Sequence, residues 1–295
     1  MNINQECRLL LETKGITVTK KNVLRRRRSH VVYRIHTKNN SYILKCFQTQ
    51  LIAKEISVYR LLQEYDVPTL PCYGMTDKAI VLEDLEASKN WFLACESDMS
   101  LISTGVAVAN WYRNLHQIGF EIVGNSTRNL QDVHPWVCDI TSKALFRVGK
   151  KYHLSNLPVW DEMLKNYELL IREYQSCPQT FNYSDFAMEN LALSSLRDNK
   201  QQAIVFDYDN FSIGTVYSDW QNVVYSLQGK AIDAFKEAYG EVQEKEQRLD
   251  DFLGILYGLI VASNRDTFPG WALPLLKSFE NGDIERIMEI ALEIV

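Results

Sequence analysis

Two short apolar runs around a polar turn, near the middle of the chain, restrict the fold more than any other stretch. The runs are Leu191–Leu196 and Ala203–Phe206, and the turn between them is Arg197–Lys200, which contains Asp and Asn. This pattern predicts a β-hairpin. Because a hairpin returns the chain to its starting end, the residues before the first run and after the second run should lie together.

Three polar residues flank this predicted hairpin. Asn190 precedes the first run, Asp207 follows the second, and Asp185 lies on the segment that enters the hairpin. If the turn is symmetric about Asp198–Asn199, Asn190 faces Asp207 across the ladder, with directly opposed side chains about 5 Å apart. A slip of one residue would change every pair, so this register is a hypothesis. Two carboxylates and an amide are then gathered at one end of the hairpin.

The oxygen atoms of these three side chains suit Mg²⁺, which keeps several waters and completes its shell with substrate phosphates. Asn190 and Asp207 are therefore candidate metal ligands, and Asp185 is a candidate base for the proton of an attacking hydroxyl. Together they match the needs of phosphoryl transfer. The alternative interpretation is a hairpin with solvated polar ends, because the spacing Asp-x4-Asn also arises by chance.

A lysine and a glutamate in the N-terminal part occur where apolar side chains are expected. Two strands predicted around Asn39–Asn40 place Lys45 on an apolar face. The next helix, predicted over about Gln50–Glu64, carries Glu55 within its apolar stripe. A charge on an apolar face is costly without a partner. We therefore expect Lys45 and Glu55 to pair.

The order of the predicted elements indicates an α+β chain. Two strands and a helix are followed by two more strands, at about Cys72–Met75 and Ala79–Leu85. From Asp98 onward apolar residues recur mostly at helical spacing, and the central hairpin interrupts the helices.

The sequence of Asp185, Asn190, a hairpin and an apolar strand that ends in Asp207 resembles the catalytic loop and metal-binding Asp of the protein-kinase-like fold. It is most similar to the aminoglycoside phosphotransferase and choline kinase family, in which small hydroxylated molecules are phosphorylated. The resemblance implies a two-lobed α+β fold. Residues 1–85 would be a small nucleotide-binding lobe, with an antiparallel sheet and one main helix. Residues 86–295 would be a larger, mostly helical lobe for catalysis and substrate binding.

The resemblance also implies a role for each residue of the pattern. Lys45 would contact the nucleotide phosphates, and Glu55 would orient it. Asp185 would act as the catalytic base or position the hydroxyl group. Asn190 and Asp207 would bind Mg²⁺.

Two further segments of the resemblance concern the nucleotide, which would be ATP or GTP. The strand ending at Leu85 resembles the kinase hinge, where backbone groups near Glu83 and Leu85 would bind adenine. The loop between the first strands normally carries glycine or serine over the phosphates, but here it is Arg25–Ser29, without glycine. Phosphate contacts would then come from Ser29, arginine side chains or backbone N–H groups.

Composition and charge argue against several other classes of protein. The net charge of −5 disfavours general nucleic-acid binding, and Arg25–Arg28 is more typical of a solvated or phosphate-facing turn. No apolar run approaches the ~18 residues of a membrane span, and the N-terminal segment contains acids, unlike a secretory signal. Six scattered cysteines without a Cys-x-x-Cys pair predict free thiols in the cytoplasm, without a zinc site or disulfides.

The chain departs from the family at its catalytic loop, which reads Tyr183-Ser184-Asp185 instead of the usual His-Gly-Asp. With the glycine-free nucleotide loop, this departure leaves two hypotheses open. The first is an active kinase that phosphorylates an amino sugar, an aminoglycoside, a choline-like molecule or a related metabolite. The second is a catalytically silent kinase-fold protein that binds a nucleotide or a protein partner.

Acidic stretches in the C-terminal half bear on the acceptor. They could line a site for a cationic acceptor, or they could be ordinary solvated helix faces. The stretches are Asp161–Glu162, Glu241–Glu246 and Asp250–Asp251. The sequence does not indicate an oligomeric state.

Overall fold

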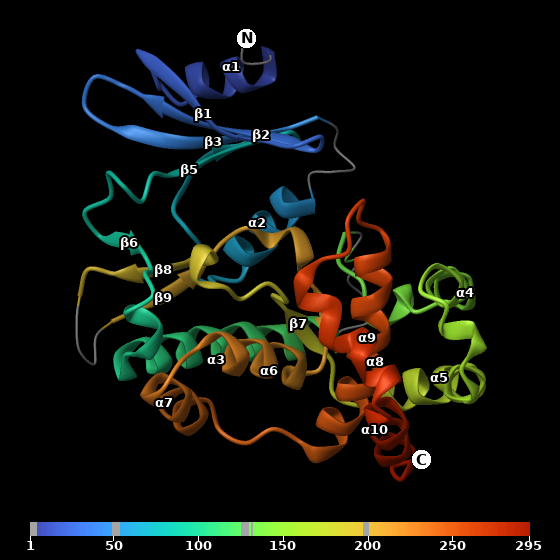
Figure 1. Cartoon of the computed structure of the whole chain (residues 1–295). Helices are drawn as coiled ribbons and strands as arrows, with labels where there is room; N and C mark the ends of the chain where they lie inside the picture. The colour runs from blue at the N-terminus through green and yellow to red at the C-terminus, as the bar shows by residue number, and fades with distance from the viewer. Residues whose placement is uncertain (1–4, 49–53, 125–129, 131, 197–200) are drawn as a thin grey trace. The chain divides into compact units, whose positions relative to one another are not determined.

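The computed structural model of the chain describes residues 5–48, 54–124, 130, 132–196 and 201–295 (Figure 1). Contacts divide the chain into two compact units. The first unit comprises residues 1–118, 183–211 and 222–240, and the second comprises residues 119–182, 212–221 and 241–295. Within the described ranges, no helix combines the length and the apolar composition that crossing a membrane requires.

A five-stranded antiparallel sheet organises the N-terminal part of the first unit, with strand order β1-β2-β3-β5-β4 (Figure 1). The hairpin predicted around Asn39–Asn40 is confirmed, since His36 of β2 pairs with Ser41 of β3. The strands are β1 (Lys20–Arg26), β2 (His30–His36), β3 (Ser41–Phe47), β4 (Cys72–Met75) and β5 (Ala79–Glu83).

Two helices lie on opposite faces of this sheet, as Figure 1 shows: α1 (Gln5–Thr13) and α2 (Lys54–Glu64). Alternate side chains of a strand point to opposite faces of the sheet, so the two helices face different sets of strand side chains. The predicted helix at Gln50–Glu64 is confirmed from Lys54 onward, and its residues 50–53 lie outside the described ranges. The core on the α1 side consists of Cys7, Leu10, Leu11, Tyr33, Ile35, Leu44, Cys46, Ala79 and Val81.

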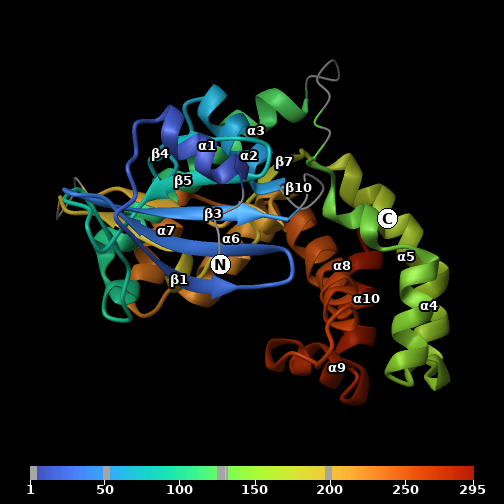
Figure 2. The same ribbon diagram turned by 90° about the horizontal axis from the view of Figure 1, so that it is seen from above.

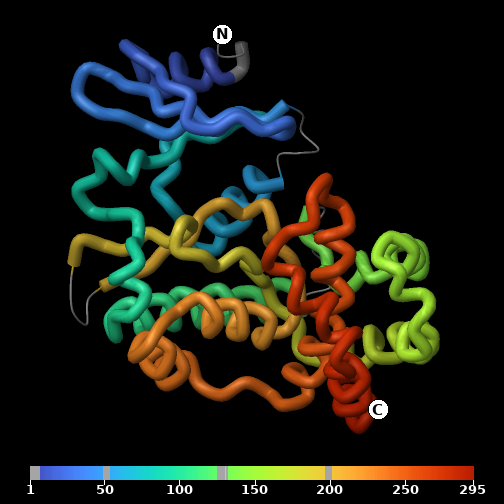
Figure 3. The backbone as a smooth tube through the Cα atoms, in the orientation of Figure 1, coloured from blue at the N-terminus to red at the C-terminus, as the bar shows by residue number. Residues whose placement is uncertain are grey.

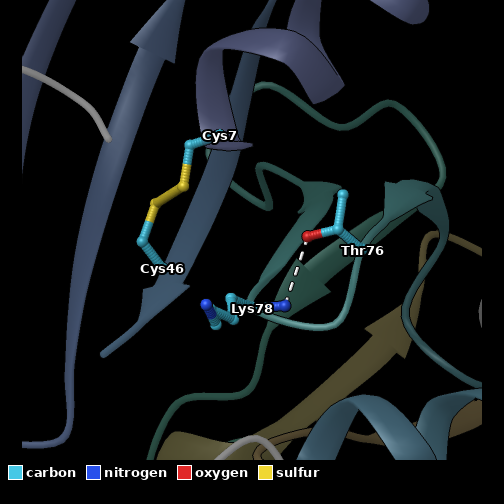
Figure 4. Close-up of a disulfide and its surroundings, with 4 residues drawn as sticks. All are labelled: Cys7, Cys46, Thr76 and Lys78. Atoms are coloured by element: carbon cyan, nitrogen blue, oxygen red, sulfur yellow. Dashed lines mark hydrogen bonds between the residues drawn. A yellow bond between two sulfur atoms is a disulfide. The ribbon is translucent and has the colours of Figure 1, made fainter. Parts of the chain in front are cut away.

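A disulfide joins α1 to β3, between Cys7 and Cys46 (Figure 4). The expectation that every cysteine is a free thiol is therefore wrong for this pair. The two residues are 39 positions apart in sequence, and their proximity depends on α1 folding back over the sheet, which cysteine spacing alone does not reveal. The free cysteines of the described chain are Cys72, Cys95, Cys138 and Cys177.

The central hairpin is confirmed, but its predicted register is wrong by one residue. Strand β8 (Leu191–Ser194) pairs with β9 (Ala203–Val205) so that Leu191 lies opposite Val205. The Asn190 carbonyl accepts a hydrogen bond from the Phe206 N–H at 3.1 Å, so Phe206 lies opposite Asn190 and Asp207, the predicted partner, lies one residue further along the chain. Pairing ends before a longer connection, whose residues 197–200 lie outside the described ranges, so a symmetric two-residue turn does not set the register. Strand β6 (Trp91–Leu93) pairs with the other side of β8.

Helices dominate the rest of the chain, and Figure 3 traces the last three of them through the C-terminal segment. In the second unit a short strand pair, β7 (Thr180–Asn182) and β10 (Ser212–Gly214), accompanies a large helical core. Helix α8 contacts α4, α5 and α10, which makes it central to that core (Figure 2). The helices are α3 (Ile102–Val123), α4 (Ser142–Lys151), α5 (Pro158–Ser176), α6 (Val216–Ser226), α7 (Lys230–Tyr239), α8 (Glu244–Ser263), α9 (Leu273–Glu280) and α10 (Asp283–Leu292).

Two acids of the C-terminal stretches are buried in the second unit rather than solvated. Glu246 is 1% exposed and Asp250 is 4% exposed. Asp250 Oδ2 accepts a hydrogen bond from the Tyr174 hydroxyl at 3.2 Å and another from the Ser218 hydroxyl. Burial outweighs these hydrogen bonds and raises the pKa of Asp250 to about 7. The carboxyl group therefore binds its proton much more tightly in the folded chain than in the unfolded chain, where its pKa is about 3.9.

This raised pKa predicts a pH dependence of stability. Because the folded state binds the Asp250 proton more tightly than the unfolded state does, the contribution of this group to the unfolding free energy is complete below about pH 4. That contribution is lost as the pH rises towards 7. Asp250→Asn keeps a neutral side chain with an acceptor oxygen. Relative to wild type, it should gain about 2 kcal/mol of unfolding free energy between pH 5 and pH 8. Urea denaturation at both pH values measures this difference, and the exposed Asp161→Asn is the matched control. An equal effect of Asp250→Asn at both pH values would contradict it.

Candidate active site

Lys45 of β3 is the centre of a buried group of charges in the first unit. Its ammonium contacts the Glu55 carboxylate of α2 and lies 2.8 Å from Asp207 Oδ1, just after β9. Lys45 is 6% exposed and Glu55 is 1% exposed, so these charges compensate each other with little help from water. The pair predicted from the two apolar faces is confirmed, and Asp207 joins it.

These contacts set the charge states of the three groups. Burial disfavours the Lys45 ammonium, but the Glu55 and Asp207 carboxylates outweigh burial and raise the pKa of Lys45. Burial also disfavours the Asp207 carboxylate, yet Lys45 outweighs it and holds the pKa of Asp207 below its usual value. Burial raises the pKa of Glu55 to about 7, although Lys45 opposes this shift. Lys45 and Asp207 are thus charged at neutral pH.

Asp185 and Asn190 form a second polar pair at the entrance to the hairpin. The Asn190 side-chain amide donates hydrogen bonds to the Asp185 carboxylate and to the Asp185 backbone carbonyl, each at 3.1 Å. Burial, followed by the nearby charge of Asp207, raises the pKa of Asp185 to about 6. A carboxylate of this kind is ionised at neutral pH and is a better proton acceptor than an ordinary exposed aspartate.

The backbone around these groups is held in an unusual conformation at two positions. Ser184 has φ 61° and Asp207 has φ 69°, both in the left-handed region that non-glycine residues seldom adopt. The buried Tyr183 donates its hydroxyl hydrogen bond to the Phe206 carbonyl at 2.5 Å, which ties the segment before Asp185 to the end of the hairpin. Strained positions of this type concentrate at functional sites.

Carboxylate groups that could hold a divalent cation gather beside Lys45. Within the described chain, one group of three acids has ligand atoms within 4.8 Å of one another: Glu55, Asp207 and Asp209. Glu55 is buried and engaged by Lys45, whereas Asp207, which also contacts Lys45, is half-buried and Asp209 is exposed, so these two carboxylates are the more accessible ones. Their hard oxygen atoms, with the amide oxygen of Asn190, fit the preferences of Mg²⁺.

A cavity of about 390 Å³ opens beside these charges, and every residue that lines it belongs to the first unit. Both aliphatic side chains and charged or polar side chains line it. This combination suits a ligand with an apolar ring and an anionic end. The aliphatic lining is Leu24, Val32, Ile43, Leu70, Leu82, Leu85 and Leu93, and the polar lining includes His30, Arg34, Lys45, Glu55, Asp84 and Asp207.

The hinge-like segment after β5 contributes to the same cavity, which both Glu83 and Leu85 line. Between them, Asp84 is 2% exposed. Its Oδ2 lies 2.8 Å from Arg34 Nε and accepts a hydrogen bond from the Ser41 hydroxyl at 2.6 Å. These contacts fix the segment against β2 and β3. The predicted phosphate contact, Ser29, has its hydroxyl 3.0 Å from His30 Nδ1.

Comparisons of the sequence and of the structure with known proteins give different results. No family model and no curated protein matches the sequence, but solved structures match the whole chain. A choline kinase from Streptococcus pneumoniae is 14% identical, covers 96% of both chains and gives a TM-score of 0.56. A spectinomycin phosphotransferase in complex with ADP and spectinomycin is 15% identical, covers 99% of this chain and 98% of its own, and gives 0.56. A macrolide 2′-phosphotransferase from Brachybacterium faecium is 12% identical, covers 95% and 98%, and gives 0.59.

The chain has the protein-kinase-like fold. Its similarity to aminoglycoside phosphotransferases and choline kinases, first indicated by the motif around Asp185, is confirmed at the level of structure. So is the expected α+β class, with a small antiparallel sheet in the N-terminal region and a larger helical part. At these identities the likeness extends to the fold alone.

Within this kinase-like fold, two residues near Lys45 were missed by sequence reasoning. Asp209 follows Asp207 by two residues and was not considered as a possible metal ligand. His30 was overlooked because it follows the arginine run, although the predicted pairing of the two strands indicates that it lies near Lys45. It pairs with Phe47 in the β2–β3 ladder, and Phe47 shares a strand face with Lys45. The predicted roles of the site residues in binding and catalysis stay predictions.

Proposed function

We propose that this protein is a Mg²⁺-dependent small-molecule kinase that transfers the γ-phosphate of ATP or GTP to a hydroxyl group. The acceptor is an amino sugar, an aminoglycoside, a choline-like molecule or a related metabolite. The single observation that supports this most strongly is the 2.8 Å contact between the Lys45 ammonium and Asp207 in the cavity wall. In this contact, the cation that would bind phosphate lies next to the carboxylate that would bind the metal, and the two residues are the first and the last of the motif.

In this proposal the nucleotide base occupies the aliphatic part of the cavity, next to the backbone of Glu83 and Leu85. Lys45 binds the phosphates, and Glu55 keeps its ammonium in position. Asn190 and Asp207 hold Mg²⁺, which neutralises phosphate charge when it is bound. We assign nucleotide binding to residues 1–85 and catalysis with acceptor binding to residues 86–295.

Asp185 supplies the proton acceptor for the reaction. The acceptor hydroxyl lies against its carboxylate, and the proton passes to that carboxylate as the oxygen attacks the γ-phosphorus. The bond from that phosphorus to the bridging oxygen of the β-phosphate breaks, and the nucleoside diphosphate leaves. The hydrogen bonds from Asn190 keep the Asp185 carboxylate in one orientation. Most of the catalysis in such a site comes from positioning and charge, because phosphoryl transfer requires little covalent chemistry from the protein.

Structures of similar fold support the choice of ligands. One is a spectinomycin phosphotransferase in complex with ADP and spectinomycin, and another is an aminoglycoside phosphotransferase in complex with GDP and kanamycin. They motivate testing both adenine and guanine nucleotides and amino sugars, and the choline and ethanolamine kinases of similar fold motivate testing amino alcohols.

The experiment that tests this function is a screen of acceptors. The purified protein is incubated with Mg²⁺ and ATP or GTP, together with hydroxylated amines, sugars or antibiotics. Nucleotide consumption is followed, and products are analysed by mass spectrometry for one added phosphate. We expect at least one acceptor to stimulate consumption and to become phosphorylated. Metal-dependent nucleotide binding without stimulation by any acceptor would favour the silent kinase-fold alternative.

A further inference from the structure

The connection between β1 and β2 raises a question about phosphate binding. It consists of Arg27–Ser29, because the predicted loop residues Arg25 and Arg26 belong to β1, and the stretch Arg25–Ser29 contains no glycine. In kinases a glycine-rich loop covers the phosphates and lets the backbone approach them. Residues with a Cβ hold the backbone further from a ligand. If the cavity binds a nucleotide, as proposed above, a side chain in this region must replace part of that contact.

His30 is the side chain in the right place. It begins β2, is 3% exposed and lines the cavity together with Lys45 and Asp207. Its ring centroid lies 5.8 Å from the centroid of Phe47, and the Lys45 ammonium lies 5.4 Å from the same Phe47 centroid. His30 and Lys45 therefore lie near the same aromatic ring, on the cavity face of the sheet.

The two ring nitrogens of His30 have different surroundings. Nδ1 lies 3.0 Å from the Ser29 hydroxyl, whereas Nε2 makes no hydrogen bond to the part of the chain that the structure describes. When the Ser29 hydroxyl donates to Nδ1, the proton of the neutral ring resides on Nε2. Nε2 is then an unused donor on a residue of the cavity wall.

Burial, together with the nearby charge of Lys45, favours a neutral His30 ring before a ligand binds. Lys45 and Arg27 oppose its protonation, and Asp207 and Asp209 favour it. Burial is the largest influence and, with Lys45, leaves the pKa of His30 below its usual value. An uncharged imidazole with one free N–H can donate to an anionic oxygen without repelling Lys45.

We propose that His30 donates a hydrogen bond from Nε2 to the terminal phosphates of the bound nucleotide, in the place of a glycine-loop backbone contact, and that Ser29 orients its ring. The inference rests on the proposed nucleotide site, but it concerns a residue that the motif did not include. It makes His30 a determinant of how strongly the site prefers triphosphates over nucleosides.

Calorimetric titration with nucleosides and their mono-, di- and triphosphates tests this role, in both the adenine and the guanine series and with Mg²⁺ present. His30→Leu should weaken triphosphate binding about tenfold, the size of one lost hydrogen bond to a charged group. It should leave nucleoside binding unchanged. His30→Gln, which keeps a neutral donor, should retain most of the affinity. His36→Leu makes the same change at the other end of β2 and should have no effect.

The pattern across the series separates the possible outcomes. Equal weakening of nucleoside and triphosphate by His30→Leu would mean a packing role and would overturn the inference, as would unchanged triphosphate binding. Either result, with wild-type binding intact, leaves the proposed function standing. Failure of the wild-type protein to bind any member of either series would overturn both.

Discussion

Asp185→Asn should lower kcat for acceptor phosphorylation by about 10²–10⁴-fold, the usual contribution of a general base, with nucleotide affinity nearly unchanged. Asparagine has the shape of aspartate and still offers an oxygen to the Asn190 amide, whose bond to the carboxylate is 3.1 Å long. It cannot accept the hydroxyl proton. Steady-state rates with a phosphorylated acceptor, and calorimetric nucleotide affinity, measure the two effects separately.

A matched control for this variant is Asp233→Asn, which makes the same change at an exposed position on α7. It should retain wild-type rates. The pKa of about 6 for Asp185 in the free protein adds a second signature. As the pH falls below about 6, the carboxyl group is protonated and kcat/KM should decrease. Rates for Asp185→Asn within a fewfold of wild type would contradict the assigned role of Asp185.

Lys45→Met should affect both stability and nucleotide binding. The change leaves the Glu55 and Asp207 carboxylates without their shared partner, and removing one member of a buried ion pair costs about 3–5 kcal/mol. Side-chain exposures of 7% for Lys45, 1% for Glu55 and 27% for Asp207 indicate the lower end of that range. Loss of the phosphate contact should weaken nucleotide binding about 10–100-fold. Urea denaturation and calorimetry measure the two quantities.

A double variant separates these two consequences of losing Lys45. Lys45→Met with Glu55→Gln replaces the buried carboxyl group of Glu55, which has lost its partner, with a neutral amide, so it should recover part of the unfolding free energy. It should not recover nucleotide affinity, because the ammonium is still missing. Full nucleotide affinity in this double variant would show that Lys45 supports the fold only.

The features that sequence reasoning predicted well are those encoded by short-range patterns. Lys45 and Glu55 each stood out as a charge on an apolar face, and the need of a buried charge for a partner was enough to pair them. The hairpin followed from two apolar runs. The register of the hairpin could not be predicted from these runs. Leu191 pairs with Val205, and the connection between the strands is longer than the shortest turn, so the turn does not fix the pairing.

The features that were missed depend on contacts between distant segments. Cys7 meets Cys46 only because α1 packs against the sheet. Asp250 resembled a solvated helix residue until the structure placed it against Tyr174 and Ser218. These contacts follow from tertiary packing, which the spacing of residues along the chain does not specify. His30 is an exception, because the β2–β3 hairpin that places it opposite Phe47 was predicted, but the arginines before it were interpreted as a turn.

The most direct measurement of the central claim is triphosphate affinity, determined by calorimetry with Mg²⁺ and with EDTA, in wild type and in Asp207→Asn. Asp207 carries a lowered pKa and lies next to Asp209 and Lys45, so it should be the main protein ligand of a nucleotide-bound cation. We expect Mg²⁺ to tighten wild-type binding about tenfold or more, the effect of one or two charged contacts, and Asp207→Asn to abolish that gain. Equal wild-type affinity in Mg²⁺ and EDTA, or an undiminished metal effect in Asp207→Asn, would contradict the account.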